Sequence, residues 1–175
     1  MVKIVQKDER VLHEKAAEVP VSDIPSPKIQ KIISDMKEAL AGEEDGVAIA
    51  APQIGAQMRI FIVSGSFLEM EKGKGKNKIN KKNDLVFINP EIIKLSKQKE
   101  FMQEGCLSVR WLYGEVLRAK NATIKAYDEN GKQFTRGAGG LLAQIFQHEV
   151  DHLNGILFIE KAKNIEEVLP EKFDR

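Results

Sequence analysis

Two histidines lie four residues apart in segment 147–152, whose sequence is Gln-His-Glu-Val-Asp-His. If this segment is helical, His148 and His152 lie one turn apart on the same face, close enough to bind one metal ion. Apolar residues precede them at helical spacing, so the pair continues an apolar stripe and should face the interior. Glu149 is placed to contact a metal-bound water without being a ligand itself. The motif therefore predicts a metal centre with an adjacent acid–base group.

A catalytic metal ion usually has three protein ligands and one open position for water. The remaining histidine, His13, lies in a charged N-terminal segment and is expected to be exposed and to have no role at the metal site. One choice for the third ligand is a downstream glutamate, as in a zinc protease, and the candidates are Glu160, Glu166 and Glu167. The other choice is Cys106, the only cysteine in the sequence. A thiolate with two neutral imidazoles suits Fe(II), Zn(II) or Ni(II) better than Mg(II) or Ca(II).

A third segment, 46–55, has the sequence Gly-Val-Ala-Ile-Ala-Ala-Pro-Gln-Ile-Gly. It predicts a glycine-bounded turn of small residues next to a strand, and it lacks the Gly-Lys-Ser/Thr ending of a phosphate-binding loop. Gln53 is the one residue of this segment whose side chain can donate a hydrogen bond into a site. The alternative is a tight loop that only packs.

The composition limits the classes to which this protein could belong. It has 175 residues, with Lys+Arg 27 and Asp+Glu 26, which leaves a net charge of +1. This balance gives no overall reason to expect nucleic-acid or membrane binding. A single cysteine excludes an internal disulfide framework and indicates a reducing compartment. We therefore expect one domain over residues 1–175, in a soluble, cytoplasmic and monomeric protein without a membrane-spanning segment.

Local signals predict two helices separated by strands. Ser26 and Pro27 begin one helix that extends to Leu40 and ends at Gly42, and the second spans about 138–153. Asn89-Pro90 is expected to break a strand, residues 16–24 to be extended, and the segment after residue 160 to form no long helix. The expected strands are 59–63, 85–88, 91–95, 121–127 and, after an Asn130-Gly131 hairpin turn, 132–136. This order favours an α+β fold with mostly antiparallel sheet.

Residues 71–84 contain six lysines and two glycines with almost nothing apolar. This composition predicts a flexible, solvated Lys-rich loop between two strands. A local basic contact to RNA or another polyanion is the alternative.

In this order, the three motifs resemble those of the peptide deformylase family. Segment 46–55 resembles the family's Gly-x-Gly-x-Ala-Ala-x-Gln motif, segment 104–108 its Glu-Gly-Cys-Leu-Ser motif, and segment 147–152 its Gln-His-Glu-x-Asp-His motif. Weaker likeness covers nearly the whole sequence. The resemblance implies an α+β fold in which mostly antiparallel sheets pack around a central metal-binding HExxH helix.

The resemblance also implies a reaction, the hydrolysis of the N-formyl group from the N-terminal formyl-methionine of newly synthesised polypeptides, with release of formate. Cys106, His148 and His152 are then expected to bind one divalent metal ion, physiologically Fe(II) in this family. The same donor set also accepts Zn(II), Ni(II) or Co(II). Glu149 is expected to act as a general base and then as a general acid.

Further residues acquire expected roles from the family motifs. The Gln53 amide and the Leu107 backbone N–H are expected to stabilise the oxyanion on the formyl oxygen. Glu104 is expected to pair with an arginine, for which Arg118 is the matching candidate. The expected substrate-binding residues, along the peptide backbone and in an apolar slot for methionine, are Val47, Ala48, Gly105 and Ile145.

The sequence departs from the family motifs at two places. Ala48 replaces the second motif glycine, where a left-handed backbone would cost about 1–2 kcal/mol. Residues 109–113, Val-Arg-Trp-Leu-Tyr, stand where many members have a proline-glycine turn. Trp111 and Tyr113 are expected either to shape the rim of the pocket or simply to pack.

Two other functions are compatible with parts of the sequence. A zinc metalloprotease would use the histidine pair but leave Cys106 and Gln53 without a role. A catalytically idle, ribosome-associated metal-binding protein would need only the ligands, with the Lys-rich loop as its contact. Because Gln53 and Glu149 are also present, we predict a working deformylase. Its partners are then N-formyl-methionyl nascent peptides and, transiently, the ribosome, with no membrane and no specific nucleic acid.

Overall fold

The computed structural model describes residues 2–71 and 84–170, except the side chain of Glu71. It contains two antiparallel sheets. The five-stranded sheet has the order β1-β2-β3-β6-β7 and the three-stranded sheet the order β4-β5-β8. The strands are β1 (Ala48–Ala50), β2 (Ile60–Val63), β3 (Leu85–Leu95), β4 (Lys99–Glu104), β5 (Leu112–Ala119), β6 (Asn121–Tyr127), β7 (Gln133–Gly139) and β8 (Lys163–Glu167). The helices are α1 (Pro27–Ala41), α2 (Gly65–Glu71) and α3 (Gly140–Leu153), with short 3₁₀ turns at Arg10–His13, Val21–Asp23, Ala51–Ile54 and Phe158–Glu160. The predicted α+β class with antiparallel sheets is confirmed.

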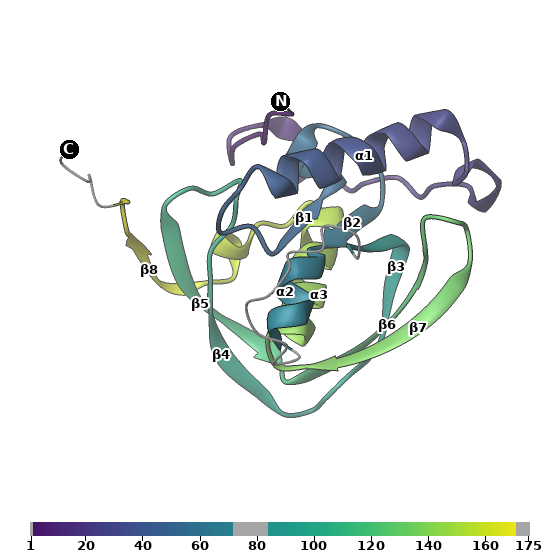
Figure 1. Ribbon diagram of the computed structural model, residues 1–175. Coiled ribbons are helices and arrows are strands. Elements are labelled where there is room, and N and C mark those ends of the chain that lie inside the picture. Colours follow the sequence, from purple (N-terminus) through teal and green to yellow (C-terminus); the bar gives the residue numbers. More distant parts are fainter. Residues whose placement is uncertain (1, 72–83, 171–175) are drawn as a thin grey trace.

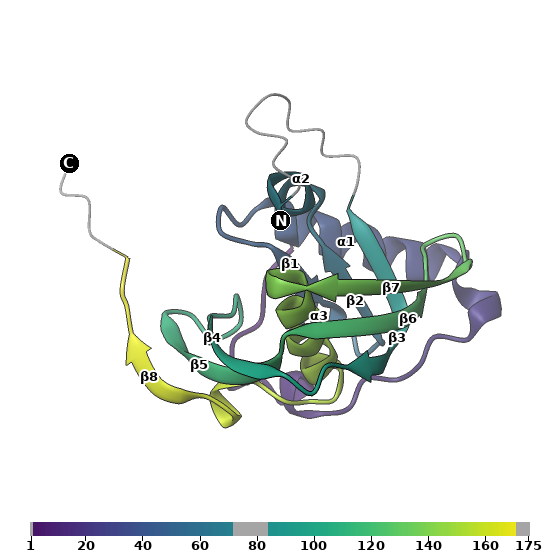
Figure 2. The same ribbon diagram turned by 90° about the horizontal axis from the view of Figure 1, so that it is seen from below.

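Helix α3 lies between the five-stranded sheet and the β4–β5 pair (Figures 1 and 2). Strand β2 shows how the larger sheet is covered on both faces. Ile60 and Ile62 pack in a cluster with α1, while Phe61 packs on the opposite face with Phe146 of α3. Alternation along a strand directs successive residues to opposite faces, so a run of buried apolar residues is what a sheet between two helices requires.

The predicted first helix is confirmed as α1. The Ser26 hydroxyl accepts a hydrogen bond from the Ile29 N–H, and Pro27 occupies the first turn, where its missing N–H leaves no bond unmade. Gly42 follows the last helical residue, as expected.

The predicted second helix is confirmed as α3, with one correction at its start. It begins at Gly140 rather than Ala138, because Ala138 and Gly139 complete β7 by pairing with β6. Its end is as expected. Asn154 caps the helix and Gly155 follows with φ 75°, a left-handed conformation that glycine adopts without penalty.

Distant segments hold the C-terminal end of α3. The Arg59 guanidinium donates hydrogen bonds to the Leu153 carbonyl at 2.9 Å and to Asn154 Oδ1 at 3.0 Å. At the next residue, a Cβ added to Gly155 would lie 2.8 Å from both the carbonyl carbon and the carbonyl oxygen of His13. The C-terminal end of α3 is therefore held between the N-terminal segment and Arg59, the residue before β2.

The predicted break at Asn89-Pro90 is wrong, because β3 continues through it. The register with β6 shifts between Ile88 and Glu91, which marks a bulge that tolerates a proline without a ladder hydrogen bond. Asn89 has φ 50°, and its amide group bonds both the N–H and the carbonyl of Val19. The 130–131 turn joins β6 to β7 as predicted.

Several elements were not predicted, and some predictions are only partly met. Helix α2 and strands β4, β5 and β8 had no strong local pattern. The expected extended segment 16–24 includes a bridge from Ala17 to Met58, but its Val21–Asp23 part is a 3₁₀ turn. As expected, no long helix follows residue 160 in the part described up to residue 170. The Lys-rich loop was predicted at 71–84. Glu71 is the last residue of α2, and residues 72–83 lie outside the described part. Within residues 2–71 and 84–170, no helix has the length and apolar character needed to cross a membrane.

Candidate metal centre

Helix α3 presents His148 and His152 one turn apart, with their ring centroids 5.0 Å apart. Gln147 fixes the rotation of the helix against β5: its amide accepts from the Ala119 N–H at 2.9 Å and donates to the Ala119 carbonyl at 3.0 Å. The imidazoles therefore face inward beside the end of β4. His152 is buried, and the imidazole of His148 is 12% exposed.

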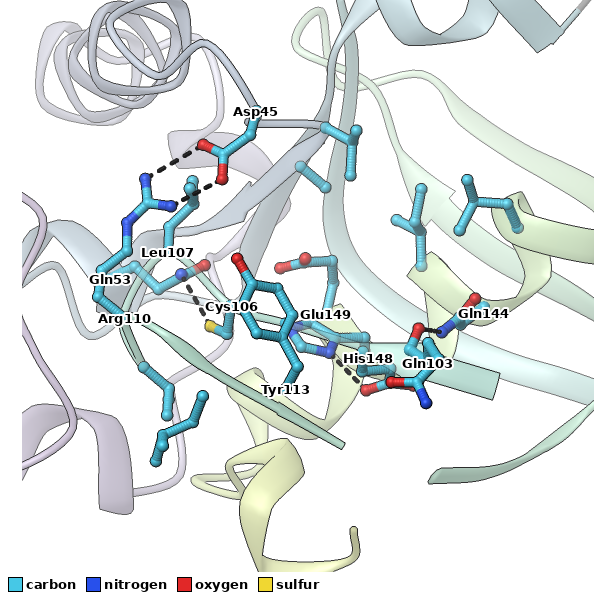
Figure 3. Close-up of a pocket in the computed structure, with 18 of the residues that line it drawn as sticks. Asp45, Gln53, Gln103, Cys106, Leu107, Arg110, Tyr113, Gln144, His148 and Glu149 are labelled. Carbon is cyan, nitrogen blue, oxygen red and sulfur yellow. Dashed lines mark hydrogen bonds and ion pairs between the residues drawn. The ribbon is translucent and has the colours of Figure 1, made fainter. Parts of the chain in front are cut away.

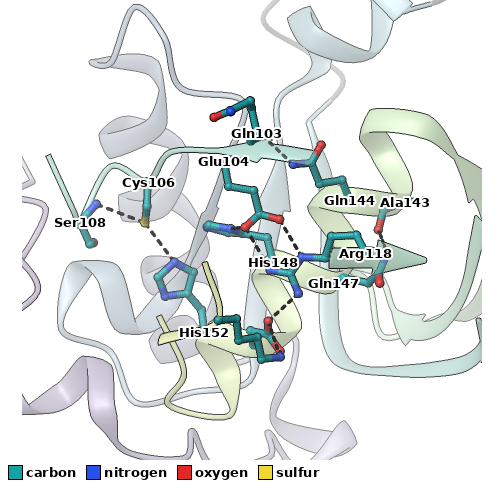
Figure 4. Close-up of polar contacts among 12 residues, drawn as sticks. Gln103, Glu104, Cys106, Ser108, Arg118, Ala143, Gln144, Gln147, His148 and His152 are labelled. Atoms are coloured by element: carbon teal, nitrogen blue, oxygen red, sulfur yellow. Dashed lines mark hydrogen bonds and ion pairs between the residues drawn. The ribbon is translucent and has the colours of Figure 1, made fainter. Parts of the chain in front are cut away.

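Cys106 joins the histidine pair from the loop after β4 (Figure 4). Its Sγ lies 3.2 Å from His152 Nε2, and the ligand atoms of Cys106, His148 and His152 all lie within 4.8 Å of one another. The Ser108 N–H donates to Sγ at 3.4 Å and helps to fix the position of the sulfur.

This cluster fits a tetrahedral metal ion. Metal–ligand bonds of about 2.0–2.3 Å separate two ligand atoms by roughly 3.3–3.6 Å, close to the 3.2 Å between Cys106 Sγ and His152 Nε2. The downstream glutamates lie elsewhere: Glu160 accepts a hydrogen bond from the Leu157 N–H, and Glu166 and Glu167 are exposed on β8. Within the described residues, the only cluster of three metal-ligating groups contains the cysteine and no glutamate.

A buried ion network orients His148. Its Nδ1 lies 2.8 Å from Glu104 Oε2, and the Arg118 guanidinium binds both oxygens of Glu104 at 2.7 and 3.0 Å. Arg118 also donates to Asp151 at 2.7 Å. The pairing of Glu104 with Arg118 inferred from the family motif is thus present in the structure.

The network determines which nitrogen of His148 carries the proton. Burial alone would raise the pKa of Glu104, but hydrogen bonds from His148 and Arg118 outweigh it and lower this pKa to about 2. The ionised carboxylate only accepts hydrogen bonds, so His148 Nδ1 must donate and its Nε2 lone pair is left for a metal ion. His152 Nδ1, in contrast, is buried with no hydrogen-bond partner among the described residues.

Glu149 lies beside the histidines and lines the same cavity as His148 (Figure 3). It is buried, and its Oε2 has no hydrogen-bond partner among residues 2–71 and 84–170. Burial raises the pKa of this carboxyl group from its ordinary value of 4.5 to about 7. Its proton affinity therefore suits uptake and release near neutral pH.

Gln53 directs its amide nitrogen toward the cysteine. Its Oε1 accepts a hydrogen bond from the Ala50 N–H at 2.8 Å, so the amide orientation is determined by a backbone donor. The opposite end, Nε2, lies 3.6 Å from Cys106 Sγ and 3.1 Å from Ser108 Oγ. Leu107 is held nearby, where its carbonyl accepts from the Gln6 amide at 3.0 Å.

Cys106, His148 and Glu149 line one cavity of about 410 Å³. Its walls come from the segment before β1, the loop after β4, the start of β5 and the inner face of α3. All four predicted substrate-binding residues line it: Val47, Ala48, Gly105 and Ile145. Catalytic candidates Gln53, Leu107 and Glu149 line it as well.

The structure removes one expected strain and introduces another. Ala48 is an ordinary strand residue that pairs with Val63, so no left-handed penalty arises there. Trp111 instead has φ 62°, a left-handed conformation. Both Trp111 and Tyr113 line the cavity.

Some residues at the site had not been identified from the sequence. Ser108, which contacts both Gln53 and the cysteine, lies inside a recognised motif and could have been found there. Asp151 also lies in a motif, but its pairing with Arg118 depends on the fold. Gln6 is separated from Leu107 by more than half of the sequence and carries no local signal. His13 is exposed, as expected.

Comparison with known proteins gives a consistent result. The family model described as polypeptide deformylase matches residues 1–168. A peptide deformylase of Carboxydothermus hydrogenoformans is 41% identical over 163 residues, which cover 93% of this sequence and 94% of that protein. One of Halothermothrix orenii is 42% identical over 157 residues, covering 90% of each. The crystal structure of a peptide deformylase from Legionella pneumophila superposes with a TM-score of 0.80 at 34% identity, covering 94% of this protein and 87% of that one.

Proposed function

The protein belongs to the polypeptide deformylase family, and on that premise we propose the residues that carry out its reaction. It is a metal-dependent hydrolase that removes the N-formyl group from the N-terminal formyl-methionine of polypeptides and releases formate. The observation that carries the proposal is a Cys/His/His cluster at the edge of a cavity that Glu149 and Gln53 also line. Oε2 of Glu149 has no hydrogen-bond partner among the described residues.

Cys106, His148 and His152 would hold the metal ion, which we propose to be Fe(II). The donor set also accepts Zn(II), Ni(II) or Co(II). When bound, such an ion polarises the formyl oxygen and lowers the pKa of a water molecule. With one thiolate and two neutral imidazoles as ligands, a divalent site would keep a charge of +1, which favours both effects.

Glu149 acts as the proton carrier. As a carboxylate it takes the proton of the attacking water, and as a carboxylic acid it returns that proton to the departing amine. Its position one residue after His148 places it against the reacting atoms without using it as a ligand. Burial supports this role because it keeps bulk water away from the transferred proton.

Gln53 and Leu107 stabilise the negative charge that develops on the formyl oxygen. The Gln53 Nε2 donors are already directed toward the site by the Ala50 hydrogen bond, so little reorganisation is needed during the reaction. Loss of one such donor typically lowers the rate by about 10²–10³-fold.

The peptide binds in extended form between two walls of the cavity. Strand β1 is the edge of the five-stranded sheet, and Ala48 pairs with Val63 on one side only, which leaves the other edge for an added strand. Gly105 forms the opposite wall. Val47 and Ile145 line the apolar slot for methionine, and the small formyl hydrogen passes where an acetyl methyl group would clash.

The biological substrates we propose are nascent polypeptides in the cytoplasm, reached through transient contact with the ribosome. Support comes from the family's reaction, because formyl-methionine marks newly made polypeptides.

Formate release from formyl-Met-Ala-Ser tests the reaction, with protein prepared without oxygen and loaded with Ni(II). We expect turnover by the wild type and a loss of about 10²–10⁴-fold in kcat for Glu149→Ala with its metal retained. The matched control is Glu166→Ala, an exposed glutamate on β8, which should keep both metal and activity. No formate from folded, fully metallated wild type would overturn the proposal.

Metal content tests the ligand set and the identity of the ion. Cys106→Ser should lose metal on dialysis against a chelator, whereas Glu166→Ala should not. The reverse result would support the protease ligand set. Elemental analysis of protein purified without oxygen should find iron, and zinc as the main metal would contradict the Fe(II) assignment.

A further inference from the structure

The N-terminal segment contacts both residues assigned above to the oxyanion, yet the reaction as described gives this segment no role. The Val5 N–H donates to the Gln53 carbonyl at 2.9 Å. The side chain of the next residue, Gln6, donates from Nε2 to the Leu107 carbonyl at 3.0 Å. Gln53 and Leu107 come from segments that are far apart in the sequence. Two consecutive residues therefore connect the backbones of the two residues that supply the oxyanion donors.

The peptide group between Leu107 and Ser108 is bound at both of its ends. Its carbonyl oxygen accepts from Gln6, and its N–H donates to Cys106 Sγ at 3.4 Å. A peptide group is planar, so contacts at both ends fix its orientation. The Leu107 N–H, which belongs to the adjoining peptide group, donates to no acceptor in the described part of the chain. It is therefore held in place by its neighbour and remains free to donate to a ligand.

Contacts on both sides hold Gln6 in position. Its Oε1 lies 3.5 Å from the backbone nitrogen of Arg110, and its carbonyl accepts from the Glu9 N–H at 2.9 Å. Val5, the residue before it, packs against the buried cluster that includes Val109. Gln6 thus belongs to an ordered segment, and its amide can hold the carbonyl group that it binds.

Gln6 is exposed, whereas Leu107 is 8% exposed. Replacement of Gln6 therefore removes a hydrogen bond without opening a cavity in the core. A water molecule in place of the amide would satisfy the carbonyl oxygen of Leu107. It would not fix the position of that oxygen, because it is not attached to the chain. The contact of Gln6 therefore matters more for position than for stability.

The position of an oxyanion donor has narrow limits. Such a donor acts at about 2.7–3.1 Å from the oxygen on which charge develops, and supporting contacts must hold it within about 0.5 Å. The Gln53 amide is held by its own contacts, since Oε1 accepts from Ala50 and Nε2 donates to Ser108 Oγ at 3.1 Å. The Leu107 carbonyl accepts only from Gln6 in the described part of the chain. Loss of Gln6 therefore releases the Leu107 donor and leaves the Gln53 donor fixed.

We propose that Gln6 is a positioning residue for the reaction. It holds the Leu107 carbonyl so that the Leu107 N–H stays directed, together with the Gln53 amide, at the oxygen on which negative charge develops. This charge develops only in the transition state, so loss of Gln6 lowers kcat and leaves KM nearly unchanged. The inference rests on the proposed function, because it takes Gln53 and Leu107 as the oxyanion donors.

Steady-state kinetics with formyl-Met-Ala-Ser test the inference, with Ni(II)-loaded enzyme. For Gln6→Leu, we expect kcat to fall about fivefold and KM to change by less than about twofold. Gln6→Glu keeps the shape of the side chain, but its carboxylate cannot donate to a carbonyl, so kcat should fall at least as much. The matched control is Gln30→Leu. The Gln30 amide also donates to backbone carbonyls, those of Ile24 and Glu129, but Gln30 does not line the cavity, so kcat should not change.

The ways in which this test can fail are distinguishable. If the Gln6 variants keep the wild-type kcat, or if their loss falls mainly on KM, the residue does not position an oxyanion donor and the inference is overturned. An equal loss of kcat in Gln30→Leu overturns it as well, because any lost amide would then have the same effect. If wild-type enzyme releases no formate, the proposed function fails, and this inference with it.

The Leu107 N–H itself provides a second readout that does not depend on turnover. In Zn(II)-loaded Glu149→Ala protein with nitrogen-15-labelled leucines, saturating formyl-Met-Ala-Ser should move the Leu107 amide proton signal downfield, as a new hydrogen bond does. Loss of one signal in Leu107→Met assigns it, and the signal of Leu117, which is exposed on β5, should not move. When Gln6→Leu is added, we expect a shift about half as large, because the donor is less well aligned. A shift of unchanged size would overturn the inference.

Discussion

Two arginines of this protein, Arg118 beside the metal centre and Arg110 at the cavity wall, each bind two carboxylates, but they do so in different surroundings. The side chain of Arg118 is 4% exposed and that of its partner Glu104 is 2% exposed. For Arg110 the value is 22%, and for its partner Asp45 57%. A buried charge that loses its partner stays unsolvated, so the loss costs several kcal/mol of stability. A solvent-exposed charge that loses its partner is solvated by water, so the loss costs about 1 kcal/mol or less.

The two ion clusters accordingly serve different purposes. The Arg118 cluster keeps Glu104 ionised and thereby orients His148, so the metal centre depends on it. The ion pairs of Arg110 with Asp45 and Glu43 hold the turn that contains Trp111. The buried Arg118 cluster therefore affects whether the metal centre can form. The more exposed Arg110 cluster affects only the position of the turn at the cavity wall.

Removal of the buried arginine should have the largest effect. Arg118→Met leaves the buried Glu104 carboxylate without its arginine, and we expect the free energy of unfolding to fall by about 3–5 kcal/mol. Half-buried Asp151 keeps its ion pair with Lys161. Urea unfolding followed by far-UV circular dichroism measures it. Arg10→Met, which alters an ion pair with a 90% exposed arginine, should change the value by less than about 1 kcal/mol. Equal midpoints for Arg118→Met and wild type would contradict the comparison.

Neutralising one buried carboxylate should have the next largest effect, on metal binding. Glu104→Gln keeps the shape of the residue but weakens the acceptor for His148 Nδ1, so metal affinity should fall by about 10–100-fold. Competition with a chelator for Zn(II) measures the affinity. The control is Glu115→Gln, a half-buried carboxylate of β5 that bonds Asn164 away from the histidines. Unchanged affinity in Glu104→Gln would mean that packing alone orients the imidazole.

The smallest effect is expected at the cavity wall. Arg110→Met should lower the free energy of unfolding by less than about 1 kcal/mol, because Asp45 is largely exposed and Glu43 partly so. The same urea titration compares it directly with Arg118→Met. A loss as large as that of the buried arginine would show that burial does not separate the two clusters.

Elements with local signals were predictable from the sequence, and those that depend on distant pairing were not. Helices α1 and α3 have caps and a regular apolar stripe. Strand β4, in contrast, is polar and mostly exposed, so no alternation marked it. The bulge at Asn89 is stabilised through Val19, which is far away in the sequence, and the proline that follows is locally a signal for the end of a strand.

The same division applies to the site. The histidine pair and Glu149 follow from spacing on one helix, whereas Cys106 and Gln53 acquired their roles from the family resemblance. Their convergence at one cavity depends on the fold. Gln6 approaches Leu107 only after the N-terminal segment has crossed the molecule, so no pattern near either residue could have indicated the contact.

The close approach of Gly155 to His13 also bears on the order of folding. The C-terminal end of α3 is completed only when segments from near the two ends of the described part meet, and contacts of such long sequence separation form slowly. We expect the helix end, and with it the final position of His152, to be completed late in folding. The metal ion would then be acquired by a nearly native polypeptide rather than guide its collapse.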